Sequence, residues 1–167
     1  KIVAIKLKNN LLVQKGDTLL TLSKENLETE KQLNDTIYTT NETILQDLEM
    51  VLKGNSNLKT ALIREEYYKF ATQKAELQSK VAQAQINYNR YKTLFDKGVI
   101  AKAEFEKYQF DLQFAKQALN SFVKQQMANW QNKKNELTLQ LKNITGSKNK
   151  LNIVHQYYIF IASITLT

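Results

Sequence analysis

Two long segments of the chain repeat apolar and aromatic residues at spacings of four and three. The second segment departs from this alternation with a double step of four at Gln126 and Trp130, which indicates a stutter, a local unwinding of the supercoil. This heptad spacing predicts two helices, over residues 58 to 97 and 102 to 147, that pair through these stripes. The first stripe is Ile63, Tyr67, Phe70, Lys74, Leu77, Val81, Ala84, Tyr88, Tyr91 and Phe95, and the second is Phe105, Tyr108, Leu112, Ala115, Leu119, Phe122, Gln126, Trp130, Lys134, Leu137, Leu141 and Ile144. Since only a tip at residues 98 to 101 separates them, the helices should form an antiparallel hairpin with arms roughly 60 to 70 Å long.

Weaker patterns flank the hairpin. Residues 24 to 53 predict a further helix, in which Ile37, Ile44, Leu48 and Val51 recur at coiled-coil spacing while Asn34 and Asn41 interrupt the series. Residues 1 to 22 alternate apolar and polar positions around expected turns at Asn9-Asn10 and Lys15-Gly16-Asp17, which is typical of short strands. We therefore expect a β part at 1–22, an α-helical part at 23–156 and a returning strand at 157–167.

Charge bears on where the additional helix packs. Residues 23 to 57 carry a net charge of −4, whereas residues 58 to 97 carry +4 and residues 98 to 150 carry +5. This contrast favours packing of helix 24–53 beside the other two, although an exposed ion pair contributes under about 1 kcal/mol. The alternative is end-to-end stacking below the second helix, which requires a third helix that reaches toward Gln156.

Composition gives no support for catalysis or for a bound cofactor or metal. The chain has no cysteine and one histidine, His155, which is expected to be structural. The carboxylate pairs Glu65-Glu66 and Glu104 with Glu106 occupy helix positions that are usually solvated. Glycine occurs four times and never as a phosphate-binding loop, and the lysines are dispersed rather than clustered for nucleic acid. We expect a protein that is not an enzyme.

The reversal between the two helices has its own chemistry. Gly98 can adopt a left-handed conformation at the end of the first helix. Ala101 and Glu104 have the spacing of a capping box, but alanine cannot accept the hydrogen bond that serine would accept there. Arg90 precedes the stripe residue Tyr91, so Arg90 should point away from the pairing surface and meet solvent or another chain.

Several motifs resemble one family. Arg90, Leu94 and position 101 have the spacing R-x3-L-x6-S, and the surrounding "DKGVIAKAEFE" is similar to the hairpin tip of HlyD-type membrane fusion proteins, the periplasmic adaptors of type I secretion and tripartite efflux systems. The stretches "LKNNLLVQKGDTLLTLS" and "YYIFIASITLT" resemble the two strands that flank the hairpin in that family, with Ser163 where proline is expected. Ala101 departs from the family's serine.

The resemblance implies a mostly α fold, in which a long coiled-coil hairpin with an additional helix is inserted in a partial β lipoyl-like (barrel-sandwich) domain. It implies that Arg90, Leu94, Gly98 and Ala101 form a partner-binding tip for a TolC-like outer-membrane channel. It also implies an inner-membrane transporter, of the ABC type, as a second partner and self-association into a ring, expected to be a hexamer. The chain would lie in the periplasm, anchored to the inner membrane by a segment outside this sequence.

Two other functions stay open. The first is an export accessory protein without an outer-membrane channel partner, which the loss of the tip serine favours. The second is a cytosolic coiled-coil scaffold, whose similarity to lipoyl-like strands would be coincidental. An N-terminal membrane segment in a longer sequence would favour an adaptor over a scaffold. No such segment is apparent within these residues, where no run approaches the roughly 18 apolar residues of a membrane span.

Overall fold

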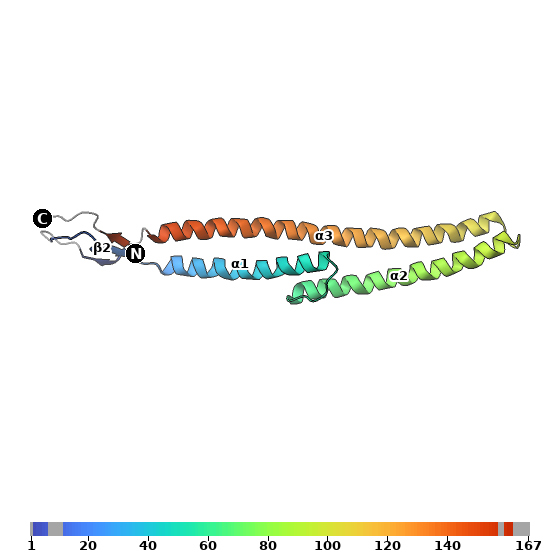
Figure 1. Ribbon diagram of the computed structural model, residues 1–167, viewed down its shortest axis with the longest axis horizontal. Coiled ribbons are helices and arrows are strands. Elements are labelled where there is room, and N and C mark those ends of the chain that lie inside the picture. The colour runs from blue at the N-terminus through green and yellow to red at the C-terminus, as the bar shows by residue number, and fades with distance from the viewer. Residues whose placement is uncertain (1, 7–11, 157–158, 162–167) are drawn as a thin grey trace. The chain divides into compact units, whose positions relative to one another are not determined.

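The computed structural model describes residues 2–6, 12–156 and 159–161 (Figure 1). These residues are mostly helical with a small antiparallel sheet, in agreement with the predicted class. The elements are β1 (Ile2–Ile5), β2 (Thr18–Leu22), α1 (Glu25–Leu52), α2 (Ala61–Asp96), α3 (Lys102–Gln156) and β3 (Ile159–Ile161). The chain divides into two compact units, residues 1–42 with 137–167 and residues 43–136. This division differs from the expected 1–22, 23–156 and 157–167, because α1 and α3 each contribute to both units.

In the first unit the two ends of the chain join one sheet with the strand order β1-β2-β3. Both pairings are antiparallel, and β2 holds the centre with Leu22 opposite Ile2 and Thr21 opposite Ile159. The predicted turn before β2 is confirmed, since the Asp17 N–H donates to the Gln14 carbonyl at 3.1 Å. The expected turn at Asn9-Asn10 and the position of Ser163 lie outside the described residues.

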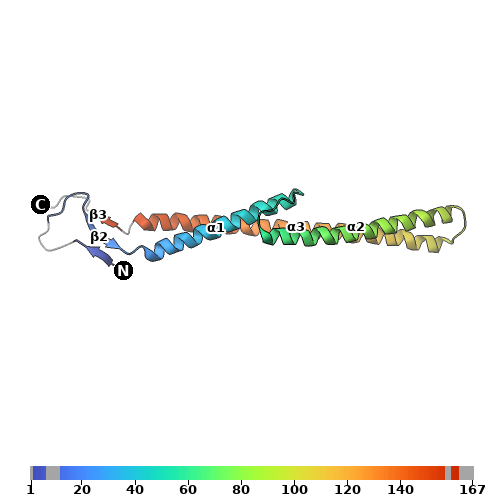
Figure 2. The same cartoon turned by 90° about the horizontal axis from the view of Figure 1, so that it is seen from below.

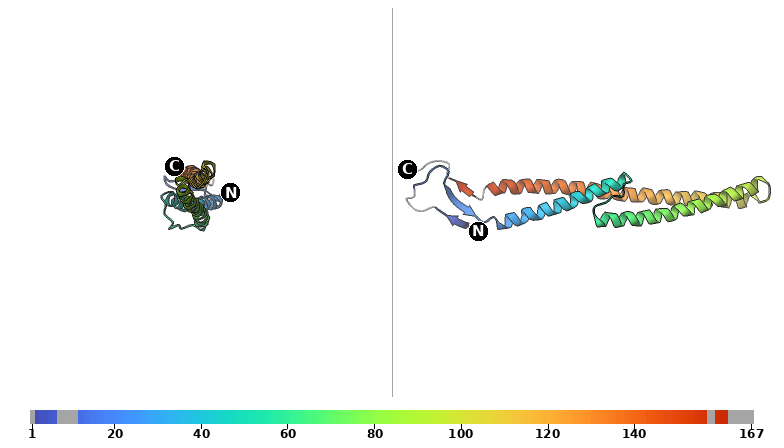
Figure 3. Two further views of the ribbon diagram at one scale, coloured as in Figure 1. Left: turned by 90° about the vertical axis from the view of Figure 1, so that its right-hand side faces the viewer. Right: turned by 60° about the horizontal axis from the view of Figure 1, so that its bottom comes forward.

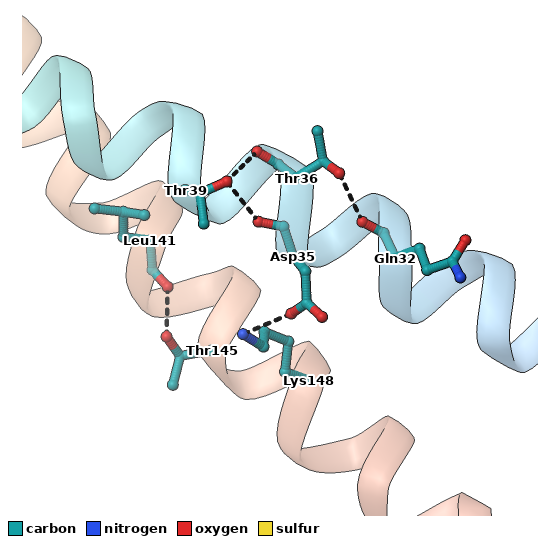
Figure 4. Close-up of polar contacts among 7 residues, drawn as sticks. All are labelled: Gln32, Asp35, Thr36, Thr39, Leu141, Thr145 and Lys148. Carbon is teal, nitrogen blue, oxygen red and sulfur yellow. Dashed lines mark hydrogen bonds and ion pairs between the residues drawn. The ribbon is translucent and has the colours of Figure 1, made fainter. Parts of the chain in front are cut away.

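Also in the first unit, the beginning of α1 lies antiparallel to the end of α3 (Figure 4). Asp35 forms an ion pair with Lys148 at 2.7 Å, and the Lys148 ammonium lies 4.9 Å from the centre of the Tyr38 ring. Helix α3 therefore continues to Gln156, and the expected end near residue 147 is wrong. Its last turns continue because the start of α1 lies along them as a partner.

The predicted seam of α1 is confirmed at Leu48 and Val51, which are buried, and at Ile44, which is half-buried, but not at Ile37. Ile37 is 39% exposed, whereas Leu27 is buried and Asn34, Tyr38 and Asn41 are half-buried. The Asn41 side chain donates to Gln140 at 3.4 Å. The asparagines thus belong to the contact rather than interrupting it. The threonine hydroxyls of this region donate to carbonyls one turn earlier, as Thr36 does to Gln32 at 2.9 Å (Figure 4). These bonds lie within the helix, so the threonines are compatible with it.

In the second unit, α2 and the first part of α3 lie side by side and antiparallel (Figures 1 and 2). The predicted pairing is confirmed, because every residue of the first stripe is buried or half-buried and rings from the two helices contact each other. Phe70 stacks on Phe122 with ring centres 5.6 Å apart and meets the edge of Trp130 at 5.0 Å. Helix α2 has 36 residues, which corresponds to about 54 Å and is shorter than the expected arm.

The last turns of α1 join this unit around a small core of Leu48, Val51, Ile63 and Trp130, each at most 1% exposed. Glu49 of α1 pairs with Lys134 of α3 at 3.0 Å. Asp35 and Glu49 of α1 thus both pair with lysines of α3. Helix α3 extends to Gln156, as the alternative of end-to-end stacking requires, and within the second unit it lies along α2 (Figure 3).

Asp47 connects α1 to the start of α2. Its carboxylate is fully buried and accepts hydrogen bonds from the N–H of Lys59 at 2.9 Å and from the N–H and hydroxyl of Thr60, each at 2.6 Å. Thr60 is the N-cap residue of α2 but makes no capping hydrogen bond with its own side chain. A carboxylate from the preceding helix therefore supplies the negative charge that a helix N-terminus favours.

Candidate functional site

The reversal between α2 and α3 is a compact turn built on Gly98. The Val99 N–H donates to the Leu94 carbonyl and the Gly98 N–H to the Phe95 carbonyl, both at 2.9 Å. Gly98 has a φ of +70°. This pair of bonds is the Schellman arrangement, in which the residue after the helix is left-handed and the final carbonyls are satisfied. The chain thus turns within a few residues.

The next helix begins at the expected position. The Ala101 carbonyl accepts the N–H groups of Glu104 at 3.1 Å and Phe105 at 3.2 Å, so Ala101 is the N-cap residue of α3. Its methyl group satisfies none of the free N–H groups of the first turn. The serine that would occupy this position in the resembled family would add one hydrogen bond here.

The four candidate residues all lie at this end of the second unit. Arg90, Gly98 and Ala101 are exposed, and Leu94 is half-buried. Within the described part of the chain, Arg90 has no hydrogen bond or ion pair. Leu94 has a structural role as well, because its carbonyl holds the turn at Val99.

Sequence reasoning did not place Val99 in the candidate site. Its side chain is 65% exposed at the outermost point of the reversal. The spacing of residues carries no signal for this exposure, because it depends on the direction in which the left-handed glycine sends the chain. A partner protein can bury this apolar side chain, between Gly98 and Ala101, without removing water from a charged group.

Stacked aromatic rings lie directly beneath the tip. Phe95 stacks on Phe105 with ring centres 5.0 Å apart, and Tyr91 stacks on Tyr108 at 3.5 Å. The hydrogen bond with Tyr91 raises the pKa of Tyr108 to about 12, with smaller contributions from burial and from nearby acidic groups. Tyr108 therefore stays neutral at any physiological pH. These rings give the tip a rigid base.

Charged side chains near the tip are partly paired. Lys92 binds Asp96 at 2.7 Å, and this hydrogen bond raises the pKa of the Lys92 ammonium. Lys102 lies 3.5 Å from Glu106 one turn later. Both pairs join residues four apart on one helix, which supports the helix ends. They leave Arg90 as an exposed cation near the reversal, in agreement with the expectation that it points away from the pairing surface.

Three of the four carboxylates considered as acids or bases, Glu65, Glu66 and Glu106, form ion pairs with lysines. Glu65 binds Lys69 and Glu66 binds Lys133, both at 2.7 Å. The described residues contain no group of three or more potential metal ligands. None of the helices in the described part of the chain is long and apolar enough to cross a membrane. The side chain of His155 lies outside the described residues.

No protein-family model matches the chain, and no curated protein matches it in sequence. Solved structures similar to the chain include two of export systems. One is the periplasmic adaptor protein EmrA, with 16% identity, a TM-score of 0.35 and coverage of 99% of this chain. The other is the soluble domain of LipC, a membrane fusion protein of a type I secretion system, with 12% identity, a TM-score of 0.34 and coverage of 98% of this chain and 85% of LipC. The chain spans 61% of the EmrA structure.

Proposed function

We propose that this chain is the hairpin region of a periplasmic adaptor that links an inner-membrane exporter to an outer-membrane channel. Its function is to present the reversal at Gly98 to the channel. The energy for transport comes from the exporter, which we propose to be of the ABC type, so the chain needs neither a catalytic group nor a cofactor.

The observation that carries this proposal is the geometry of the second unit. Two helices pair along their length through a stripe of apolar residues and are joined by a turn in which Val99 and Ala101 are exposed, with Arg90 exposed on α2 before it. A pair of helices buries only a thin stripe, which suits a spacer better than an enclosed reaction site. A rigid end with an apolar residue and a cation suits docking to another protein.

The first unit supports the same proposal at the other end of the hairpin. The strands before α1 and after α3 pair within one sheet, so residues far apart in sequence meet where the helices leave it. We propose that this sheet is part of a lipoyl-like domain. The position of a carrier lysine in a true lipoyl domain is taken here by the helices, so the domain would position the hairpin rather than carry a group.

We further propose a location in the periplasm, with anchorage to the inner membrane through a segment outside this sequence. In this setting the partners are the exporter, a TolC-like channel and further copies of the chain, assembled as a ring of six. An accessory role without a channel stays as a second candidate, because Ala101 replaces the serine of the resembled tip.

Reversal of the charge at Arg90 tests the docking role. In the whole protein expressed in its own cells, Arg90→Glu should reduce the amount of outer-membrane channel that co-purifies after cross-linking by about tenfold. Lys142→Glu makes the same change at an exposed position of α3 outside the tip and should leave the amount unchanged. Equal melting temperatures would show that both variants fold. An equal yield of channel with both variants would remove Arg90 from the docking surface.

A further inference from the structure

Two tyrosines from different helices are stacked beneath the reversal of the hairpin. Tyr91 of α2 and Tyr108 of α3 have ring centres 3.5 Å apart, and their ring planes are inclined by only 14°. The carbon atoms of the two rings are therefore in van der Waals contact. Phe95 and Phe105 stack at 5.0 Å between this pair and the tip, so neighbouring rings hold the two phenols in place.

The hydroxyl groups of the two tyrosines also meet. The hydrogen bond between them is the largest cause of the raised pKa of Tyr108, which is about 12. The ring centre and the hydroxyl oxygen define the long axis of a phenol. Because both of these points coincide in the stack, the two rings have the same orientation. The Cε carbons next to the hydroxyl of Tyr91 therefore lie opposite those of Tyr108.

These carbons are the positions at which an oxidised tyrosine reacts. Loss of an electron and a proton converts a phenol into a phenoxyl radical, whose unpaired electron is shared by the oxygen and the adjacent ring carbons. When two such radicals couple, a bond forms between one Cε carbon of each ring. The hydrogen on each of these carbons then moves to the oxygen of its own ring. Two tyrosines thus give one dityrosine, and the two electrons pass to the oxidant.

Proximity distinguishes this pair from the other tyrosines. Two radicals in free solution must meet by diffusion, whereas groups that a fold holds in contact react as one unit. Tyr67 and Tyr68 also contact each other, but their ring centres are 6.4 Å apart and their planes are inclined by 59°. Of the tyrosines that the structure describes, Tyr91 and Tyr108 are the pair that stacks ring on ring.

We propose that Tyr91 and Tyr108 form a site of oxidative cross-linking, at which a one-electron oxidant joins their Cε carbons and ties α2 to α3 beneath the tip. Each tyrosine gives an electron to the oxidant and a proton to water, which reaches the pair because both residues are half-buried. The bond closes the loop that contains Gly98, and a closed loop has fewer unfolded conformations. The inference goes beyond the proposed function and depends neither on a channel nor on further copies of the chain.

Photochemical oxidation of the purified whole protein tests the site. The probe is a light-activated ruthenium tris-bipyridyl complex with persulfate, which accepts the two electrons and becomes two sulfate ions. A tryptic digest should then contain the peptide 91–92 joined to the peptide 108–116, with two hydrogen atoms fewer and the fluorescence of dityrosine. Tyr91→Phe and Tyr108→Phe should each abolish this product. Tyr68→Phe removes a phenol that is 62% exposed and should leave the yield unchanged.

Two controls distinguish a contact within the folded chain from a chance encounter. A mixture of isotopically labelled and unlabelled protein should give joined peptides of one label only, because both tyrosines belong to the same chain. Unfolding in urea before oxidation should reduce the yield at least several-fold, because the stack is lost. Both controls use the unchanged chain, so they do not depend on how a variant folds. Joined peptides of mixed label, a yield that urea does not change, or no joined peptide would each overturn the proposal.

Discussion

Asp47 joins α1 to the start of α2, and no local sequence motif identifies it. Burial raises the pKa of its carboxyl group, but hydrogen bonds from the Thr60 hydroxyl and from the N–H groups of Lys59 and Thr60, with the Lys59 charge, outweigh burial and hold the pKa below 3.8. Because its partners are 12 and 13 residues away, spacing rules for helix caps do not find it.

We predict that Asp47→Asn lowers the free energy of unfolding at pH 7 by about 2 to 3 kcal/mol, because a buried acceptor is replaced by a donor. Because the pKa of Asp47 is lower in the folded chain than in the unfolded chain, its carboxylate contributes its full stabilisation at pH values above the unfolded pKa. That stabilisation is lost as pH falls through the folded pKa. The difference in the free energy of unfolding between Asp47→Asn and the wild type should therefore become smaller below about pH 4. Urea unfolding at a series of pH values measures this difference. Asp111→Asn, at an exposed site, is the control and should change little; a difference that persists at pH 2 would contradict this account.

At the N-cap position of α3, Ala101 stabilises the helix less than serine would. Ala101→Ser should stabilise the chain by about 1 kcal/mol and raise the melting temperature by about 2 to 4 °C, because the hydroxyl can accept the N–H of Glu104. Ala103→Ser, within the first helical turn, cannot make this bond and should give no increase. If the two variants melt alike, Ala101 is not the N-cap.

At the scale of elements, α1 and α2 end in the same way. Gly54 has a φ of +79° and Gly98 a φ of +70°, and in both cases the following N–H donates to a carbonyl five residues earlier. Gly146 is different, since it lies within α3 without a positive φ and its surroundings are open. The same substitution should therefore have opposite effects at two glycines.

Gly98→Ala should destabilise the chain by about 1 to 2 kcal/mol, because an L residue in the left-handed region is strained. Gly146→Ala should stabilise it by up to about 1 kcal/mol, because alanine is the better helix former. Thermal unfolding of the two variants beside the wild type measures both effects. A loss of stability in Gly146→Ala would indicate that this part of α3 is not a regular helix.

The sequence predicted the long helices and their pairing because stripe residues such as Phe70, Tyr91 and Phe105 recur at heptad spacing and make the contacts that the spacing implies. It also located the reversal at Gly98. It placed Ile44, Leu48 and Val51 on the buried face of α1 but was wrong at Ile37, because Tyr38 and Asn41 make the contacts there. It ended α3 too early because the apolar stripe stops at Ile144, although polar residues continue the helix along α1.

For the candidate site, the pattern identified Arg90 and Leu94 but not the exposure of Val99. Exposure at a turn depends on the direction in which the left-handed glycine sends the chain, and spacing does not contain that information. The buried Asp47 was missed for a related reason. Its contacts depend on which residues of different elements lie level with one another, which only the register of the fold determines.

At the scale of the whole molecule, the two units have separate tasks in the proposed function. The sheet of the first unit gathers the ends of the chain, and the second unit carries the tip. The same helix pair folds through its inner stripe and, in our proposal, carries a site of oxidative cross-linking at Tyr91 and Tyr108 of that stripe. The central claim is that the tip at residues 98 to 101 meets an outer-membrane channel.

A single cysteine at Val99 tests that claim most directly. Val99 is exposed, and substitution there avoids the strained φ of Gly98. In the whole protein, in its own cells, a thiol-directed cross-linker should capture an outer-membrane channel identified by mass spectrometry, while Thr72→Cys on the side of α2 should not. Capture of the same proteins from both positions, or of no channel from Val99→Cys, would contradict docking through the tip and favour the accessory role.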